Sequence, residues 1–203
     1  CTIPFNKRGE LPLDAVQAAI KPDDAHFAIT RLVCLENTQA GRVLPMDYLA
    51  DYSELAVRHG LRRHLDGSRV FNAAVALGVP VADICAHCDT VSLCLSKGLG
   101  CPVGSVVVGE PEFIERARRG RKLVGGAMRQ AGIIAAGALY ALQHHVERLA
   151  DVRRITHLAL EAEDEVRAAT RSPSIFASTL RSSSVRPSEK YSFSGLPLML
   201  TKG

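Results

Sequence analysis

The chain has 203 residues, of which 47% are hydrophobic and 23% charged, and its formal net charge is +4. This length can bury one sizeable core, and the mild charge argues against the concentrated basic face that nucleic-acid-binding proteins carry. The longest strongly apolar stretch, residues 132–142, is too short to span a bilayer, and no secretion signal is visible, so we expect a cytoplasmic protein without nucleic-acid or membrane partners.

Strands and helices alternate along the first half of the chain. Residues 11–20 have apolar side chains at helical spacing, and residues 31–36 form an apolar run of strand length. The same criteria predict helices over 46–60, 68–78 and 111–119, strands over 61–67, 90–95 and 103–109, and a helical pattern throughout 123–170. This order predicts an α/β fold with three layers, in which helices flank a mainly parallel sheet.

The two ends of the chain differ from its middle. Residues 171–195 are rich in serine and poor in large apolar residues, which predicts an irregular or disordered tail. The chain starts at Cys1 and runs at once into residues typical of a domain interior, so we expect the N-terminal part of the fold to be missing. We therefore divide the chain into a partial large domain, 1–150, and a divergent helical segment with the tail, 151–203.

The six cysteines are scattered through apolar surroundings, which favours reduced thiols in a cytosol-like compartment. Cys85 and Cys88 form a C-x-x-C motif, but a zinc site needs a second pair of ligands at suitable spacing, and none is evident. No metal is therefore expected. Buried structural thiols and a redox pair both remain open for this motif.

Two polar residues stand where predicted strands end, at Asp66 and at Lys97. In parallel α/β sheets ligands bind beyond the carboxyl ends of the strands. A desolvated lysine presents a neutral amine that attacks aldehydes, while Asp66 and Arg69 would place a carboxylate and a guanidinium beside a planar ring. A carboxylate facing a pyridine nitrogen keeps that nitrogen protonated. On the residues alone, a surface lysine in a turn and a simple Asp-Gly turn remain alternatives.

Four segments together resemble a known family. They match, in order and spacing, the low-specificity L-threonine aldolases, which are pyridoxal-phosphate enzymes of the aspartate-aminotransferase fold type. The resemblance covers about residues 1–150 and is carried by "LENTQAGRVLP", "HLDGSRVFNAAVALGVP", "SLCLSKGLGCPVGSVVVG" and "RKLVGGAMRQAGIIAAGALYAL". It implies that residues 1–150 are part of the large domain of a pyridoxal-phosphate transferase-like fold, with the N-terminal part of that domain missing.

The resemblance also implies roles around the cofactor. Lys97, in "LSKG", resembles the lysine that bonds to the cofactor aldehyde. Asp66, in "HLDG", resembles the partner of the pyridine nitrogen. Arg69 resembles the residue near the ring hydroxyl that also contacts the substrate carboxylate. Ser68 departs from the family, which usually has alanine at this position.

Three further residues are implied by the same resemblance. His26, in "DDAHFA", is similar to a family histidine near the substrate β-hydroxyl, where it would help to remove a proton. Lys122 and Arg129, in "RKLVGGAMRQ", resemble residues that reach the cofactor phosphate of a neighbouring subunit. The resemblance therefore implies a homo-oligomer, a dimer or a tetramer.

The implied activity is the cleavage of threonine or allo-threonine to glycine and acetaldehyde, with pyridoxal 5'-phosphate as cofactor. The family's glycine-rich phosphate cradle is not recognisable in this chain, so we expect the chain alone to bind cofactor poorly. Two alternatives remain open. The chain would be either a truncated, non-catalytic relative that acts as a dimerising partner, or a related pyridoxal-phosphate lyase acting on another β-substituted amino acid.

Overall fold

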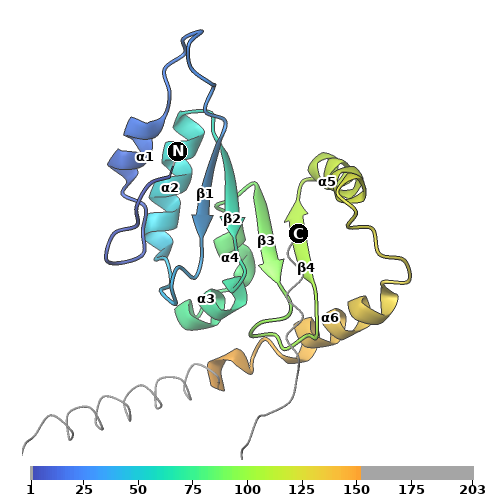
Figure 1. Ribbon diagram of the computed structural model, residues 1–203. Helices are drawn as coiled ribbons and strands as arrows, with labels where there is room; N and C mark the ends of the chain where they lie inside the picture. Colours follow the sequence, from blue (N-terminus) through green and yellow to red (C-terminus); the bar gives the residue numbers. More distant parts are fainter. Residues whose placement is uncertain (1, 152–203) are drawn as a thin grey trace, which may run out of the picture. The chain divides into compact units, whose positions relative to one another are not determined.

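A computed structural model describes residues 2–151 (Figure 1). In this part of the chain, four strands form one sheet in the order β1-β2-β3-β4. The first three strands are parallel, and β4 is antiparallel to β3. The elements are α1 (Leu13–Ala19), β1 (Leu32–Glu36), α2 (Met46–Arg58), β2 (Arg62–Asp66), α3 (Val70–Leu77), α4 (Val81–Cys85), β3 (Thr90–Cys94), β4 (Ser105–Gly109), α5 (Pro111–Leu123) and α6 (Gly132–His144). The predicted α/β class, a mainly parallel sheet flanked by helices, is confirmed.

Local sequence explains most of these elements. In α2 the buried residues Leu49, Tyr52, Leu55 and Ala56 recur at intervals of three and four, which places them on one face of the helix. Helix α3 ends at Gly78, which has φ +68°, the left-handed conformation that glycine adopts readily at a C-terminal cap. The short helix α4 follows Pro80 and was not predicted, because five residues carry too little periodicity to be recognised.

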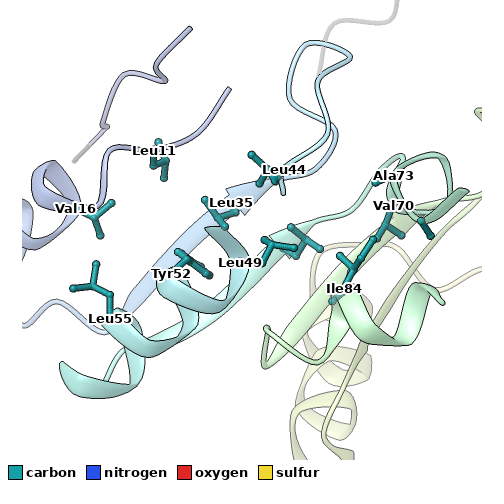
Figure 2. Packing of buried hydrophobic residues seen from close by; sticks show 13 residues of the cluster. Leu11, Val16, Leu35, Leu44, Leu49, Tyr52, Leu55, Val70, Ala73 and Ile84 are labelled. Atoms are coloured by element: carbon teal, nitrogen blue, oxygen red, sulfur yellow. The ribbon is translucent and has the colours of Figure 1, made fainter. Parts of the chain in front are cut away.

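One face of the sheet forms the main core. The register pairs Leu35 with Leu65 and Leu65 with Val91, so these three buried side chains lie side by side. Figure 2 shows side chains of α2, α3 and α4 gathered against this row. The labelled members are Leu11, Val16, Leu35, Leu44, Leu49, Tyr52, Leu55, Val70, Ala73 and Ile84. Burying this apolar surface is the main driving force for folding of this part.

The opposite face of the sheet is more open within the described residues. Cys34, His64 and Thr90 are adjacent in the register, and none of them is buried. A hydrogen bond of 2.8 Å joins His64 Nδ1 and Thr90 Oγ1 across the two strands. Because residues alternate along a strand, Asp66 and Ser92 share this face with them at the carboxyl edge of the sheet.

One sequence expectation needs correction, and others concern residues outside the described part. The helical pattern predicted from 123 onward is interrupted, because residues 124–131 form a loop that contains Gly125 at φ +81°. The rest of that pattern, the serine-rich tail and the proposed second segment 151–203 lie almost entirely outside the described residues. Across residues 2–151, none of the helices combines the length and apolarity required to cross a bilayer.

An ion pair stabilises the end of the sheet at which the parallel strands begin. Arg63, at the start of β2, donates from Nε to Asp89 Oδ2 at 3.1 Å and from Nη2 to Asp89 Oδ1 at 2.8 Å. Its backbone N–H also donates to Asp89 at 2.7 Å, and its Nη1 donates to Ser53 on α2. The side chains of Arg63 and Asp89 are only 17% and 22% exposed. This paired arrangement ties β2, α2 and the start of β3 together.

We expect the Asp89→Asn variant to be less stable than the wild type by about 1–2 kcal/mol at neutral pH. The Arg63 side chain, followed by its backbone N–H and charge, holds the pKa of Asp89 below its usual range. A carboxyl group whose pKa is lower in the folded state stabilises the fold at every pH above its unfolded-state pKa. This stabilisation is lost as the pH falls through the folded-state pKa of Asp89. Urea unfolding at pH 7 and pH 3 measures both effects. Exposed Asp51, which makes no ion pair among residues 2–151, provides the Asp51→Asn control. An equal acid dependence in wild type and Asp89→Asn would contradict this account.

Candidate functional site

Asp66 is the last residue of β2 and lies at the carboxyl edge of the sheet. Its carbonyl accepts a hydrogen bond of 3.0 Å from the Asn37 N–H, which extends the β1–β2 pairing by one residue. Its carboxylate is exposed, and Oδ1 accepts hydrogen bonds from Ser68, at 3.1 Å from N and 2.6 Å from Oγ. The strand end therefore presents an ordered, accessible carboxylate where parallel sheets bind ligands.

Gly67 allows the turn after Asp66 to lie directly on β3. Its N–H donates to the Ser92 carbonyl at 2.7 Å. A Cβ at this position would lie 2.9 Å from Val91 Cγ1 and 3.0 Å from the Ser92 carbonyl oxygen. The turn then places Arg69 at the N-cap of α3, where its guanidinium is exposed. Asp66 and Arg69 are thus brought to the same edge of the sheet, as the sequence predicted.

Lys97 follows β3 in a well-anchored loop at the same edge. Leu95 and Leu99, on either side of it, are 3% and 2% exposed and pack in a second core with α6. The Gly100 N–H donates to the Lys97 carbonyl at 2.9 Å, and His145 Nδ1 donates to the Leu99 carbonyl at 2.7 Å. These contacts fix the backbone that carries the lysine.

The desolvation that the sequence argument expects for Lys97 is not seen within residues 2–151. Lys97 is exposed, and within residues 2–151 its amine forms no ion pair or hydrogen bond. The physical reason is the path of the loop, in which Leu95 and Leu99 take the buried positions and the turn between them faces outward. The side chain is therefore accessible to a ligand.

Cys94 is the ionisable group nearest in sequence to Lys97 at this strand end. Its Sγ lies 3.3 Å from Ser96 Oγ. Hydrogen bonding to Ser96, with smaller contributions from Ser105 and the charge of Lys97, lowers the pKa of the Cys94 thiol. The thiolate form of Cys94 is therefore favoured relative to that of an ordinary cysteine.

Sequence reasoning missed two polar residues at this edge, Asn37 and Thr38, which directly follow β1. They are 0% and 6% exposed, and Asn37 Nδ2 and Thr38 Oγ1 have no hydrogen-bond partner within the described part of the chain. Asn37 Oδ1 accepts a 3.3 Å hydrogen bond from the Leu44 N–H. The rule that identified Asp66 and Lys97 would have found them if it had been applied to the end of the first strand as well.

His26 is not brought to this edge within one chain. It belongs to the segment that joins α1 to β1, which enters β1 at its amino end and extends away from the sheet there (Figure 1). His26 Nδ1 lies 2.7 Å from Asp24 Oδ1, and its side chain is 89% exposed. Backbone and side-chain hydrogen bonds from His26 hold the pKa of Asp24 below its usual range.

Lys122 and Arg129 are exposed, and neither belongs to the strand ends that carry Asp66 and Lys97. Lys122 is in the last turn of α5, and Arg129 is in the loop between α5 and α6. Around them, several large apolar side chains are exposed, at Leu123, Val124, Met128 and Ile133. This segment therefore combines positive charge with uncovered apolar surface.

The C-x-x-C motif has the properties of structural thiols. Burial raises the pKa of Cys85 and raises that of Cys88 to about 12, so both favour the protonated, unreactive form. Both side chains pack against the main core. Among residues 2–151 there is no group of three or more His, Cys, Asp or Glu side chains placed to hold a metal ion.

Known proteins are similar to this chain in sequence and in fold. The chain is 53% identical over 141 residues to the low specificity L-threonine aldolase of Escherichia coli K12, an alignment that covers 70% of this chain and 42% of that protein. It is 44% identical over 171 residues to low-specificity L-threonine aldolase 1 of Arabidopsis thaliana, covering 82% of this chain and 48% of that protein. The chain thus spans less than half the length of these relatives.

A solved structure and a family model complete the comparison. Threonine aldolase of Leishmania major superposes with a TM-score of 0.66 at 21% identity, over 78% of this chain and 48% of that one, which shows a shared fold. The sequence model of the beta-eliminating lyase family matches residues 1–179. The resemblance seen in the sequence is confirmed at this level, and the chain belongs to the beta-eliminating lyase family.

Proposed function

We propose that this chain carries part of the active site of a pyridoxal-phosphate-dependent L-threonine aldolase, which cleaves threonine or allo-threonine to glycine and acetaldehyde. The observation that carries the proposal is the position of three side chains at the carboxyl ends of the parallel strands β2 and β3. The Asp66 carboxylate is on the last residue of β2, and the Arg69 guanidinium follows in the next turn. The Lys97 amine is in the loop after β3. The similarity to proteins named L-threonine aldolases supports the same activity.

The residues at this edge fit the chemistry of pyridoxal phosphate. Its aldehyde requires a primary amine, which Lys97 supplies, and its pyridine nitrogen requires a carboxylate, which Asp66 supplies. Asn37 Nδ2 and Thr38 Oγ1, at the end of the neighbouring strand β1, are buried and have no hydrogen-bond partner among residues 2–151. Unsatisfied buried polar groups are uncommon in folded proteins, and each calls for an explanation such as a catalytic role or a bound water or ion. The donor set therefore suits a flat, polar ring.

When bound, pyridoxal phosphate supplies an electron-withdrawing ring that stabilises negative charge on the amino-acid α-carbon. The Lys97 amine would hold the cofactor through its aldehyde group, and the Asp66 carboxylate would keep the ring nitrogen protonated. The Arg69 guanidinium binds and orients the substrate carboxylate, because its planar N–H groups match a carboxylate in a paired geometry. Together these groups orient the bond between Cα and Cβ for cleavage.

His26 is proposed as the base that takes the proton from the substrate β-hydroxyl. His26 Nδ1 lies 2.7 Å from Asp24 Oδ1, and in the tautomer that donates from Nδ1 to this carboxylate, Nε2 is the acceptor nitrogen. Its segment enters the sheet at the amino edge, so in this proposal His26 serves the site of a neighbouring chain. Lys122 and Arg129 would likewise bind the phosphate of a neighbour, since they are exposed beside uncovered apolar side chains.

A homo-oligomer follows from these assignments, because each site would take residues from two chains.

The unpaired thiols of Cys34, Cys85, Cys88, Cys94 and Cys101 are consistent with a reducing compartment such as the cytoplasm. We further propose that residues 1–150 form part of the cofactor-binding domain and that 151–203 are a separate segment.

Two measurements on the purified protein test the activity and the site. Pyridoxal phosphate is added, the adduct is reduced with borohydride, and the labelled peptide is mapped by mass spectrometry. We expect the label on Lys97 in preference to the other five lysines, together with acetaldehyde release from threonine. A label spread evenly over the lysines would contradict the site, and absence of aldehyde release from a protein labelled at Lys97 would contradict the reaction.

A second candidate is a non-catalytic relative that acts as a partner of another chain. The exposed apolar side chains of residues 123–142 favour it, because large uncovered apolar surface marks an interaction site. This candidate predicts self-association or binding to a longer homologue without aldehyde release, so the same assay separates the two.

A further inference from the structure

A single residue, Ser68, makes two hydrogen bonds to the carboxylate of Asp66. The Oγ–H of Ser68 donates to Oδ1 at 2.6 Å, and its N–H donates to the same oxygen at 3.1 Å. The shorter distance lies in the range of charge-assisted bonds between a hydroxyl and an ionised carboxylate. Across residues 2–151, Oδ2 of Asp66 accepts no hydrogen bond, although the side chain is exposed. One oxygen of the carboxylate is therefore engaged and the other is free.

The turn that carries these two bonds is itself held in place. Gly67 packs against Val91 and the Ser92 carbonyl, and the Val70 N–H donates to the Gly67 carbonyl at 2.9 Å. These contacts fix the backbone that carries Ser68, and the hydrogen bond to Asp66 holds its hydroxyl. A free aspartate explores several rotamers, and a ligand that binds it must offset the entropy lost when one rotamer is selected. The hydroxyl of Ser68 removes much of that freedom before any ligand arrives.

We propose that Ser68 is a positioning residue that holds Oδ1 of Asp66, so that Oδ2 is directed to the ring nitrogen of the cofactor. This inference rests on the proposed function of the site. Alanine would keep the backbone N–H bond and lose only the shorter hydroxyl bond, which makes the contribution separable.

The competing explanation is that Ser68 only stabilises the turn before α3, as serine often does after aspartate. The two roles differ in what they affect. A positioning role influences ligands that have a ring nitrogen for Asp66 to contact. A purely structural role influences the stability of the turn and the binding of every ligand alike.

The test compares wild type, Ser68→Ala and Ser68→Thr by equilibrium dialysis against two ligands. One is pyridoxal phosphate, and the other is its 1-deaza analogue, in which a C–H group replaces the ring nitrogen. We expect Ser68→Ala to weaken pyridoxal phosphate binding about fivefold, the effect of one typical hydrogen bond, and to leave the binding of the analogue unchanged. Ser68→Thr retains the hydroxyl and is expected to restore wild-type affinity. Urea unfolding of each variant monitors the turn.

Each of the other possible results contradicts either the role of Ser68 or the proposed function. Equal weakening for both ligands, or unchanged binding of pyridoxal phosphate, would show that Ser68 does not act on the ring nitrogen, while the proposed function would stand. Weak binding of pyridoxal phosphate by the wild-type chain is expected, because the family's phosphate cradle is not recognisable in it. Complete absence of binding, even at saturating concentrations of pyridoxal phosphate, would overturn the proposed function, and this inference with it.

Discussion

Replacing Lys97 with arginine is expected to reduce borohydride-stable labelling by pyridoxal phosphate to the background level of the remaining lysines. Arginine keeps the length and the positive charge of the side chain, but its guanidinium stays protonated at any accessible pH and has no lone pair for an aldehyde. The change therefore removes the nucleophile and preserves the local electrostatics. Quantitative mass spectrometry of the labelled peptides measures the effect, and threonine cleavage is expected to disappear with it.

The matched control is Lys7→Arg. Lys7 is also exposed, in a turn near the start of the described chain, and is expected to carry only background label. Both variants should retain the wild-type midpoint in urea, because neither lysine is buried. If Lys97→Arg labels as strongly as wild type, or if Lys7→Arg loses the same amount of label, then Lys97 is not the attachment point.

Replacing Gly67 with alanine is expected to lower the free energy of unfolding by about 3 kcal/mol. The added Cβ would come within 3.0 Å of the Ser92 carbonyl oxygen and 3.1 Å of Val70 Cβ. Neither atom lies at the end of a flexible side chain, so the turn and β3 would have to separate. That movement would stretch the 2.7 Å hydrogen bond from Gly67 to Ser92 and displace Asp66. Urea unfolding monitored by circular dichroism measures the loss.

Gly120→Ala provides the matched control for a glycine change. Gly120 lies inside α5, and a Cβ there would meet no atom within 4 Å. Alanine has the higher helix propensity, so this variant is expected to be more stable by about 0.5–1 kcal/mol. Gly67→Ala at wild-type stability would show that β3 and the turn after Asp66 are not in tight contact.

The sequence alone was sufficient for the order of the elements and for the positions of Asp66 and Lys97 at strand ends. These features are local, since apolar periodicity and a glycine after a helix act through neighbours within one or two turns. It was insufficient for α4 and for the loop at 124–131. Helix α4 has only five residues, which carry too little periodic signal to be recognised. In residues 124–131, the surrounding apolar residues continued a helical pattern across Gly125 and Gly126, so the loop was not recognised.

Only the tertiary structure decided which of the candidate residues meet. Strand register, which depends on pairing between distant segments, places Asp66 beside Ser92 and next to Asn37, and sends His26 to the opposite edge. The exposure of Lys97 likewise follows from how the loop after β3 buries Leu95 and Leu99. The short bond from Ser68 to Asp66 depends on side-chain geometry in a tight turn, which residue types do not specify.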